Sequence, residues 1–179
     1  MAGSTEESRD TKMNIIGIDP GLDGAICVME HGEVRLYDVP TFEVRRGKKK
    51  KREYNLADVT DIIRKTGATL QPFHFHVALE KVHSMPGQGV ASMFSMGVGY
   101  GMWLGIIAAY QIPYTLITPQ AWKKEMMQGM GKEKDASRQR AIQLFPQIAD
   151  QLKLKKHHGR ADALLIAEYL NRSLIYKEI

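Results

Sequence analysis

Three carboxylates and one histidine stand at positions where they could do chemistry together. Asp19 and Glu80 each directly follow a short apolar run. Functional groups gather at strand ends in open α/β sheets, so neighbouring strands would bring these two acids together. Asp162 comes four residues after His158, a spacing that puts both side chains on one helical face. The four residues therefore form one candidate site.

Carboxylates packed without a counter-ion repel each other and raise each other's pKa. Hard divalent cations remove that repulsion, and oxygen ligands suit Mg²⁺ or Mn²⁺. Two such ions can hold both sides of an in-line phosphoryl displacement. The set Asp19, Glu80 and Asp162, with His158, therefore indicates a metal-dependent phosphodiesterase site.

Each residue also has a simpler structural interpretation. Asp19-Pro20-Gly21 has the composition of an ordinary turn. Glu80 could pair with Lys81 or Lys123, and His157-His158 could simply open a solvated helix. No single signal is strong, so the hypothesis depends on their joint arrangement.

Two basic segments flank these acids. Residues 45–52 hold seven Lys or Arg in eight positions, and residues 123–160 hold ten against four acids. We expect residues 45–52 to form a solvated loop, with a localisation signal as the alternative. Lys and Arg bind DNA phosphates through counter-ion release, while metal-bound acids do the chemistry.

A glycine-rich loop at residues 83–89 would let the backbone approach DNA closely, and Met85 or Phe94 could wedge against bases. A plain strand-to-helix connection with Phe94 in the core is the alternative. The predicted DNA-binding residues are Arg45, Arg46, Lys48, Lys49, Lys50, Lys51, Arg52, Lys81, His83, Met85, Gln88, Lys123, Lys124, Lys153, Lys155, Lys156 and Arg160.

Composition excludes several classes of protein. The 179 residues carry a net charge of +5, and Cys27 is the single cysteine, so an intramolecular disulfide or thiolate zinc cluster is impossible. The longest strongly apolar stretch, residues 102–110, is short of the roughly 20 residues that span a bilayer. We expect no membrane partner. Residues 1–12 lack a targeting pattern and are expected to be a disordered tail before one domain at residues 13–179.

Hydrophobic patterning predicts an α/β fold. Strands are expected at residues 14–18, 24–30, 33–39, 75–79 and 114–117, and helices at about 55–67, 92–110, 119–127, 134–144 and 158–170. The first three strands would form an antiparallel meander within one five-stranded mixed sheet, with helices on both faces.

Gly97, Gly99 and Gly101 alternate inside one expected helix. Each costs about 1 kcal/mol relative to alanine. We expect another helix to pack closely here, either within one subunit or between two copies. A dinucleotide glycine box is disfavoured, because it belongs between a strand and a helix start.

Several motifs together carry a resemblance. They are Ile-Gly-Ile-Asp-Pro-Gly around Asp19, Leu-Glu80, Tyr-Gly-Met-Trp103, and Leu-Lys-Leu-Lys-Lys-His-His-Gly-Arg-Ala before Asp162. The chain resembles the RuvC-type Holliday junction resolvases of the RNase H-like superfamily over residues 14–170. It is most similar to the chloroplast branch, which shares Trp122-Lys123 and a Lys-Asp-x-Ser-Arg segment.

The resemblance implies an RNase H-like fold and a homodimeric endonuclease that resolves four-way DNA junctions by symmetric paired nicks in recombination, DNA repair or genome segregation. Asp19, Glu80 and Asp162 would bind two Mg²⁺, with Mn²⁺ as substitute, and His158 would be a ligand or a proton-transfer group. No small-molecule cofactor is implied. The expected location is intracellular and DNA-associated, in the cytoplasm, the nucleoid or an organelle nucleoid.

Departures from the chloroplast pattern leave alternatives open. That branch carries two tryptophans where this chain has Met93-Phe94, and a glutamate where Asp162 stands, which preserves the carboxylate. Bacterial resolvases often have an acid at the position of Gly159. The alternatives are an RNase H-like nuclease for other branched DNA or RNA–DNA hybrids, and a non-catalytic junction-binding module. An actin-like sugar kinase needs two lobes, for which 179 residues are too few.

Overall fold

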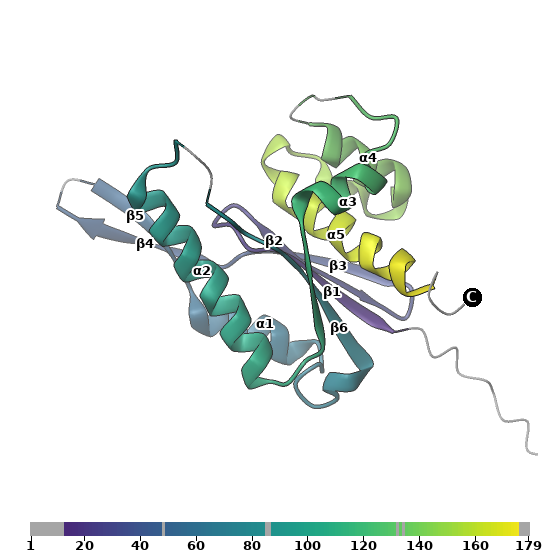
Figure 1. Ribbon diagram of the computed structural model, residues 1–179, viewed down its shortest axis with the longest axis horizontal. Coiled ribbons are helices and arrows are strands. Elements are labelled where there is room, and N and C mark those ends of the chain that lie inside the picture. The colour runs from purple at the N-terminus through teal and green to yellow at the C-terminus, as the bar shows by residue number, and fades with distance from the viewer. Residues whose placement is uncertain (1–12, 48, 85–86, 132, 134, 176–179) are drawn as a thin grey trace, which may run out of the picture.

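The computed structural model describes residues 13–47, 49–84, 87–131, 133 and 135–175 (Figure 1). The predicted tail, residues 1–12, and the predicted DNA-binding residues Lys48 and Met85 lie outside this range. The strands are β1 Asn14–Asp19, β2 Ala25–Glu30, β3 Glu33–Asp38, β4 Thr41–Arg46, β5 Lys49–Tyr54, β6 Phe75–Glu80 and β7 Tyr114–Ile117. The α-helices are α1 Leu56–Lys65, α2 Val90–Ala109, α3 Pro119–Met126, α4 Ala136–Leu144 and α5 His158–Ile175, and 3₁₀ turns cover Pro72–His74, Pro146–Leu152 and Lys155–His157.

The main sheet has five strands in the order β3-β2-β1-β6-β7. Strands β1, β2 and β3 form the predicted antiparallel meander, while β6 lies parallel to β1 and to β7. The register pairs Ile18 of β1 with Leu79 of β6. Because the two strands are parallel, the residues that end them, Asp19 and Glu80, lie at the same edge of the sheet.

Helices cover both faces of this sheet, as predicted (Figure 1). One core joins the sheet to α3, α4 and α5, and the other joins it to α1 and α2. Helix α5 passes directly over β1: a Cβ on Gly17 would overlap the Ala163 carbonyl and stand 2.7 Å from the Ala167 Cβ. This close contact brings Asp162, the residue before Ala163, toward the strand that ends in Asp19.

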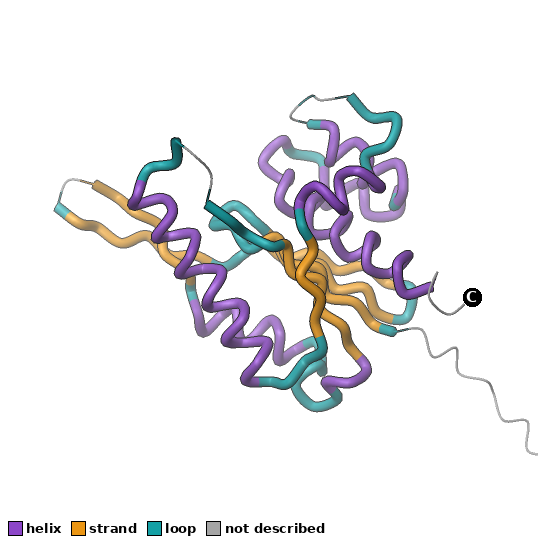
Figure 2. Tube along the Cα trace, in the orientation of Figure 1, coloured by secondary structure: helices purple, strands orange, loops and turns teal. Residues whose placement is uncertain are grey.

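The basic segment at residues 45–52 is not the loop that we expected. Strands β4 and β5 form a separate two-stranded antiparallel sheet that projects beyond the main sheet (Figure 2). Its register places Arg45 opposite Lys50 and Glu43 opposite Arg52. A hairpin satisfies its backbone by strand pairing and needs no buried side chains, so a high density of charge does not prevent strand formation.

Helix α2 bears on two further expectations, the absence of a membrane-spanning length and the close packing on its glycines. It has 20 residues and is, by length and composition alone, apolar enough to cross a membrane. The sequence expectation counted only the uninterrupted apolar stretch at residues 102–110 and left out the glycine-containing half of the helix. Only Gly99, Trp103 and Ile107 of this helix are buried, and Val90, Phe94 and Val98 are exposed by 79%, 72% and 52%. Within the described ranges no helix packs on its glycines: Gly97 and Gly101 face open space, and Gly99 contacts the Tyr54 side chain.

Candidate active site

The structure brings Asp19, Glu80 and Asp162 to one edge of the sheet. Asp19 and Glu80 end parallel neighbours, and Asp162 lies near the start of α5. The start of α5 is seated on the loop that follows Asp19, because a Cβ on Gly159 would overlap the Asp23 carbonyl and stand 2.9 Å from the Gly24 Cα. Close backbone contact therefore sets the position of the third carboxylate relative to the first.

Electrostatics show that these acids interact. The pKa of Asp19 is raised to about 7, first by burial and then by the negative charges of Asp162 and Glu80. A hydrogen bond from the Gly21 amide, 3.3 Å from Oδ1, and the charge of Lys123 partly offset this rise. A carboxylate with such a pKa sits in an environment that favours protonation or a bound cation.

Glu80 is held by a buried indole. The Nε1 of Trp122 donates a hydrogen bond to Glu80 Oε1 at 2.8 Å. Burial raises the pKa of Glu80, the Trp122 hydrogen bond lowers it, and the charge of Asp162 raises it. Helix α3 places this tryptophan, because Thr118 caps the helix by accepting a hydrogen bond from the Ala121 amide.

Asp162 has a carboxylate oxygen that could bind a ligand. Its Oδ1 is buried and has no hydrogen-bond partner within the described part of the chain. Burial raises the pKa of Asp162, and a hydrogen bond from Ser137 with the charges of Lys123 and His158 lowers it. Asp162, Ser137, Lys123 and His158 line a cavity of about 350 Å³. This places His158 beside Asp162, as the four-residue spacing predicted.

Lys123 is a cation common to the whole site. Its charge lowers the pKa of Asp19, of Glu80 and of Asp162. The ammonium lies 5.1 Å from the centre of the Trp122 ring, a cation–π contact. Lys123 therefore belongs to the carboxylate cluster as well as to the basic surface.

The donors fit a hard divalent cation in chemistry, though no coordination shell is preformed. Among the described residues, no group of three or more His, Cys, Asp or Glu is gathered closely enough to hold a metal ion. Apart from the imidazole of His158, the predicted ligands are carboxylate oxygens, which Mg²⁺ and Mn²⁺ prefer. A bound cation would pair with the buried Oδ1 of Asp162 and offset the mutual repulsion of the acids.

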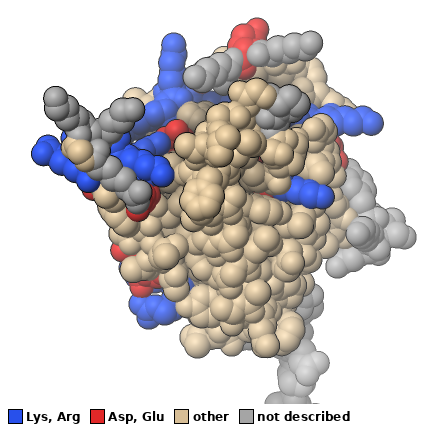
Figure 3. Space-filling view, turned by 60° about the vertical axis from the view of Figure 1, so that its left-hand side comes forward, with Lys and Arg blue, Asp and Glu red and all other residues tan. Residues whose placement is uncertain are grey.

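The predicted DNA-binding side chains surround this edge unevenly. Arg45, Lys50, Lys51 and Arg52 are exposed on the hairpin, and the backbones of Arg46 and Lys49 belong to the same strands. Further exposed members lie after β6, on α3 and before α5; they are Lys81, His83, Gln88, Lys123, Lys124, Lys153, Lys155 and Lys156. Figure 3 shows basic side chains gathered along one end of a broad face that is otherwise nearly free of charge.

Arg160 is paired with other residues of the same chain. Its Nε and Nη2 donate to the two carboxylate oxygens of Asp38 at 2.6 and 2.7 Å, and Nη1 donates to the Gln151 carbonyl at 3.1 Å. This pairing holds the pKa of Asp38 below its usual range. Arg160 ties the end of β3 to α5, and its contact with DNA stays a prediction.

Sequence reasoning missed Tyr54, Ser137 and Asp38 as neighbours of the site. It recorded Trp122 only as part of a shared motif and gave it no role. Ser137 belongs to the shared Lys-Asp-x-Ser-Arg segment, but local sequence gives neither Ser137 nor Asp38 a partner, because their partners are 25 and 122 positions away. For Tyr54 a signal existed, since the glycine pattern predicted that something packs on α2.

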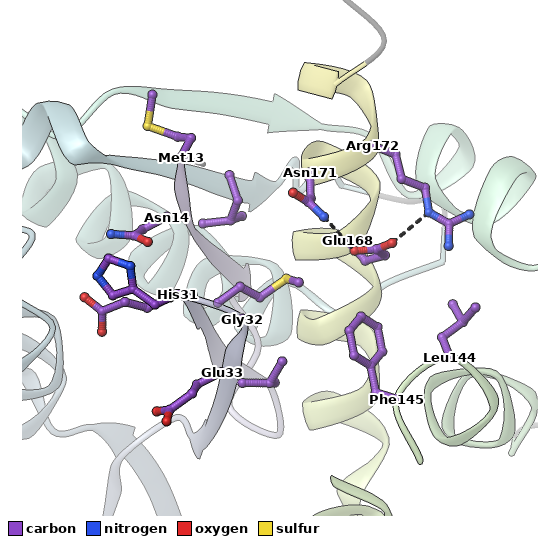
Figure 4. A pocket seen from close by; sticks show the side chains of 14 residues that line it. Met13, Asn14, His31, Gly32, Glu33, Leu144, Phe145, Glu168, Asn171 and Arg172 are labelled. Atoms are coloured by element: carbon purple, nitrogen blue, oxygen red, sulfur yellow. Dashed lines mark hydrogen bonds and ion pairs between the residues drawn. The ribbon is translucent and has the colours of Figure 1, made fainter. Parts of the chain in front are cut away.

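A cavity of about 620 Å³ lies at the opposite end of β1, around Asn14 (Figure 4). Glu168 lines it and accepts hydrogen bonds from Asn171 at 3.0 Å and Arg172 at 2.8 Å. None of the predicted site residues that the structure describes lines this cavity. The carboxylate cluster therefore remains the candidate active site, although this cavity is larger.

Comparison with solved structures defines the class of fold. The chain is similar to Thermus thermophilus RuvC in complex with a Holliday junction substrate, with a TM-score of 0.54 and 16% identity over 93% of this chain and 96% of that chain. A second Thermus thermophilus RuvC structure gives a TM-score of 0.51 and 18% identity with the same coverage. The chain has the RNase H-like fold of RuvC, as predicted.

One curated relative is similar to this chain over part of its length. The chain is 36% identical over 85 residues to the "Holliday junction resolvase MOC1, chloroplastic" of Chlamydomonas reinhardtii. The match covers 48% of this chain and 10% of that protein, so the chain spans about a tenth of the relative's length. No protein-family profile matches the chain.

Proposed function

We propose that this protein is a metal-dependent endonuclease that resolves four-way DNA junctions by symmetric paired nicks. The observation that carries the proposal is the meeting of Asp19, Glu80 and Asp162 at one edge of a RuvC-like sheet, with their pKa values raised. The names of the similar proteins support the substrate: one is a RuvC bound to a Holliday junction, the other a chloroplast Holliday junction resolvase.

Asp19, Glu80 and Asp162 would hold two Mg²⁺ ions, with Mn²⁺ as substitute. When bound, such ions polarise a phosphoryl oxygen and favour in-line attack of water, leaving 5′-phosphate and 3′-hydroxyl ends. The chain's own residues orient the reaction. Trp122 fixes one oxygen of Glu80, and His158, beside Asp162, binds metal or transfers a proton. No small-molecule cofactor is part of the proposal.

The basic residues would bind the arms of the junction. Exposed hairpin residues such as Lys50 and Lys51 lie on one side of the site, and Lys124, Lys155 and Lys156 lie on exposed positions of the other elements around it. Each phosphate neutralised releases condensed counter-ions, so binding should weaken steeply with salt. The process served would be recombination, DNA repair or genome segregation at a cellular or organellar nucleoid.

The active form would be a homodimer joined through α2. Two opposite strands must be cut, and a two-fold axis supplies two equivalent sites. Val90, Phe94 and Val98 form an exposed stripe on this helix. Gly97 and Gly101 continue it, and a Cβ on either would meet no atom of the described residues within 4 Å, so this is the kind of surface that a second copy covers. The alternative to a second copy is a lipid bilayer, which could also cover the apolar face of α2.

Strand-resolved cleavage of a fluorescent four-way junction tests the proposal directly. Linear duplex and an RNA–DNA hybrid serve as controls, each with and without Mg²⁺, and Asp19→Asn serves as the inactive variant. We expect paired symmetric nicks on the junction alone, lost without metal. Cutting confined to the hybrid, or spread over all substrates, would retain the metal site and refute junction specificity. Tight binding with no cutting would refute the enzyme.

A further inference from the structure

The loop that follows Asp19, residues 20–24, is held from two sides; we call it the Asp19 loop. On one side the first turn of α5 packs on it at Gly159, without room for a Cβ. On the other side it meets β5 of the basic hairpin, through contacts that involve Tyr54 and Arg52. Any shift of this loop moves Asp19, because the two are joined directly in the backbone.

Tyr54 makes the first contact from the hairpin. Its hydroxyl donates a hydrogen bond to the Pro20 carbonyl at 3.1 Å. The ring lies against α2 at Gly99, where a Cβ would overlap the hydroxyl and stand 2.6 Å from Cε2. Burial, and then the charge of Asp19, raise the pKa of this tyrosine. The glycine at position 99 therefore makes room for a side chain that reaches the backbone next to Asp19.

Arg52 makes the second contact. Its Nη2 donates to Asp23 Oδ1 at 2.6 Å, and the two side chains are 43% and 67% exposed. A guanidinium has five N–H donors, and one of them is engaged by Asp23. A DNA phosphate can therefore bind the exposed side of Arg52 while Nη2 keeps its contact with the Asp19 loop.

The geometry puts both contacts on one face of β5. Alternate residues of a strand point to the same side, so Arg52 and Tyr54 both face the Asp19 loop. Lys51, the residue before Arg52, projects the other way and is exposed. One strand thus presents a cation to solvent while Arg52 and Tyr54 contact the loop beside a candidate catalytic acid.

We propose that β5 is a positioning element: Tyr54 fixes the Asp19 loop at Pro20, and DNA that seats on the hairpin through Arg52 and its neighbours thereby sets the position of Asp19. The inference rests on the proposed function for its catalytic consequence. These contacts of Tyr54 and Arg52 with the Asp19 loop, which we call the clamp, are a property of the free protein and can be measured without any cleavage.

Two variants break the clamp without removing a metal-binding residue. Tyr54→Phe deletes the hydroxyl and keeps the ring. Gly99→Ala improves helix propensity and places a Cβ where the Tyr54 ring and hydroxyl lie, so it displaces that ring. Their matched controls are Tyr37→Phe, at a partly buried tyrosine of the same core, and Gly97→Ala, whose Cβ would meet no atom of the part of the chain that the structure describes within 4 Å.

Single-turnover cleavage and junction affinity are measured for all four proteins, after gel filtration shows the same size as wild type. We expect both clamp variants to lower the cleavage rate constant roughly 10- to 100-fold, since small misplacements of reacting groups have effects of that size. The junction Kd should change by less than about twofold, as for loss of an interaction that acts only in the reaction step. Equal rate constants in clamp and control variants would overturn the proposal.

Hydrogen–deuterium exchange supplies the readout that does not depend on activity. Amides of the Asp19 loop should exchange faster in Tyr54→Phe and Gly99→Ala than in wild type and the controls, with the Tm unchanged. In wild type, four-way junction DNA should slow this exchange, and the slowing should be lost in Arg52→Ala and restored in Arg52→Lys. Unchanged exchange in the clamp variants would refute the clamp. If wild type fails to cut junctions, the proposed function falls and the exchange data still decide whether the clamp exists.

Discussion

The indole nitrogen of Trp122 lies 2.8 Å from Oε1 of Glu80 and donates a hydrogen bond to it. The tryptophan is fully buried and the glutamate is partly exposed at the end of β6. One carboxylate oxygen is thus fixed from the protein interior. The interaction favours the ionised form of Glu80 in surroundings that otherwise disfavour it.

Replacing this tryptophan should change the pH dependence of cleavage. Trp122→Phe removes the hydrogen bond that lowers the pKa of Glu80, so that pKa rises further and the acidic limb of the pH–rate profile moves to higher pH. Single-turnover rates across pH at saturating Mg²⁺ measure the shift. Trp103→Phe is the matched control, because Trp103 is equally buried and its Nε1 has no hydrogen-bond partner within the described residues. The same displacement in both variants would contradict a specific role for Trp122.

Asp19→Asn should abolish cleavage and leave junction binding intact. The amide keeps the size of the side chain and can still accept from the Gly21 amide, so the local backbone is preserved. It removes the negative charge that a divalent cation needs. Cleavage and gel-shift assays on the same junction measure both properties. Persistent cutting by the variant would refute the assignment of the metal site.

The metal-free protein should lose stability as pH rises. Asp19 titrates near 3.8 when unfolded and at about 7 when folded, so between these values the folded state holds a proton that the unfolded state has released. The free energy of unfolding therefore falls through this window, by up to about 4 kcal/mol for the full shift. Glu80 and Asp162, whose pKa values are also raised, act in the same direction.

Urea unfolding in EDTA at about pH 5 and about pH 8 measures this loss. Asp19→Asn cannot ionise, so it should be the more stable protein at the higher pH and show a flatter profile. Adding Mg²⁺ to wild type at the higher pH should restore stability by mass action. A wild-type profile that rises with pH in EDTA would show that these acids do not repel each other in the folded state.

Neutralising the lysine run at residues 48–51 should weaken DNA binding and flatten its salt dependence. Replacing Lys48, Lys49, Lys50 and Lys51 by alanine removes cations that would each release about one counter-ion per phosphate contacted. Junction Kd measured at several salt concentrations gives the slope. The control replaces Arg64 and Lys65 of α1, which pair with Asp61. A slope unchanged from wild type would place the hairpin away from the DNA.

Local patterning predicted the framework of the fold because the framework depends on local rules. Strand periodicity located β1 to β3, β6 and β7 within about a residue, and Asn55 was recognisable as the cap of α1, where its side chain accepts from the Asp58 amide at 3.3 Å. Asp19 and Glu80 could be paired in advance for the same reason: strand ends in a parallel pair meet.

Long-range contacts limited what the sequence could predict. Charge density argued for a loop where β4 and β5 form a hairpin, because strand pairing between exposed residues leaves no hydrophobic trace. The spacing of Gly97, Gly99 and Gly101 indicated close packing, yet it could not distinguish a helix from the ring of Tyr54. Trp122 shows the same limit, since its partner is 42 residues away.

A charge on the open face of α2 should separate two copies of the chain. Val98 is 52% exposed in the single chain, so Val98→Asp removes little buried surface from the monomer, while in the proposed dimer it would bury an unpaired carboxylate. We expect sedimentation analysis to show dimer for wild type and monomer for the variant. Nicking by the monomer should continue singly and lose its paired symmetry. Leu70→Asp, at an 85% exposed position outside α2, is the control and should remain dimeric. A wild-type protein that is monomeric in solution and partitions into lipid vesicles through α2 would contradict the dimer and assign this face to a membrane instead.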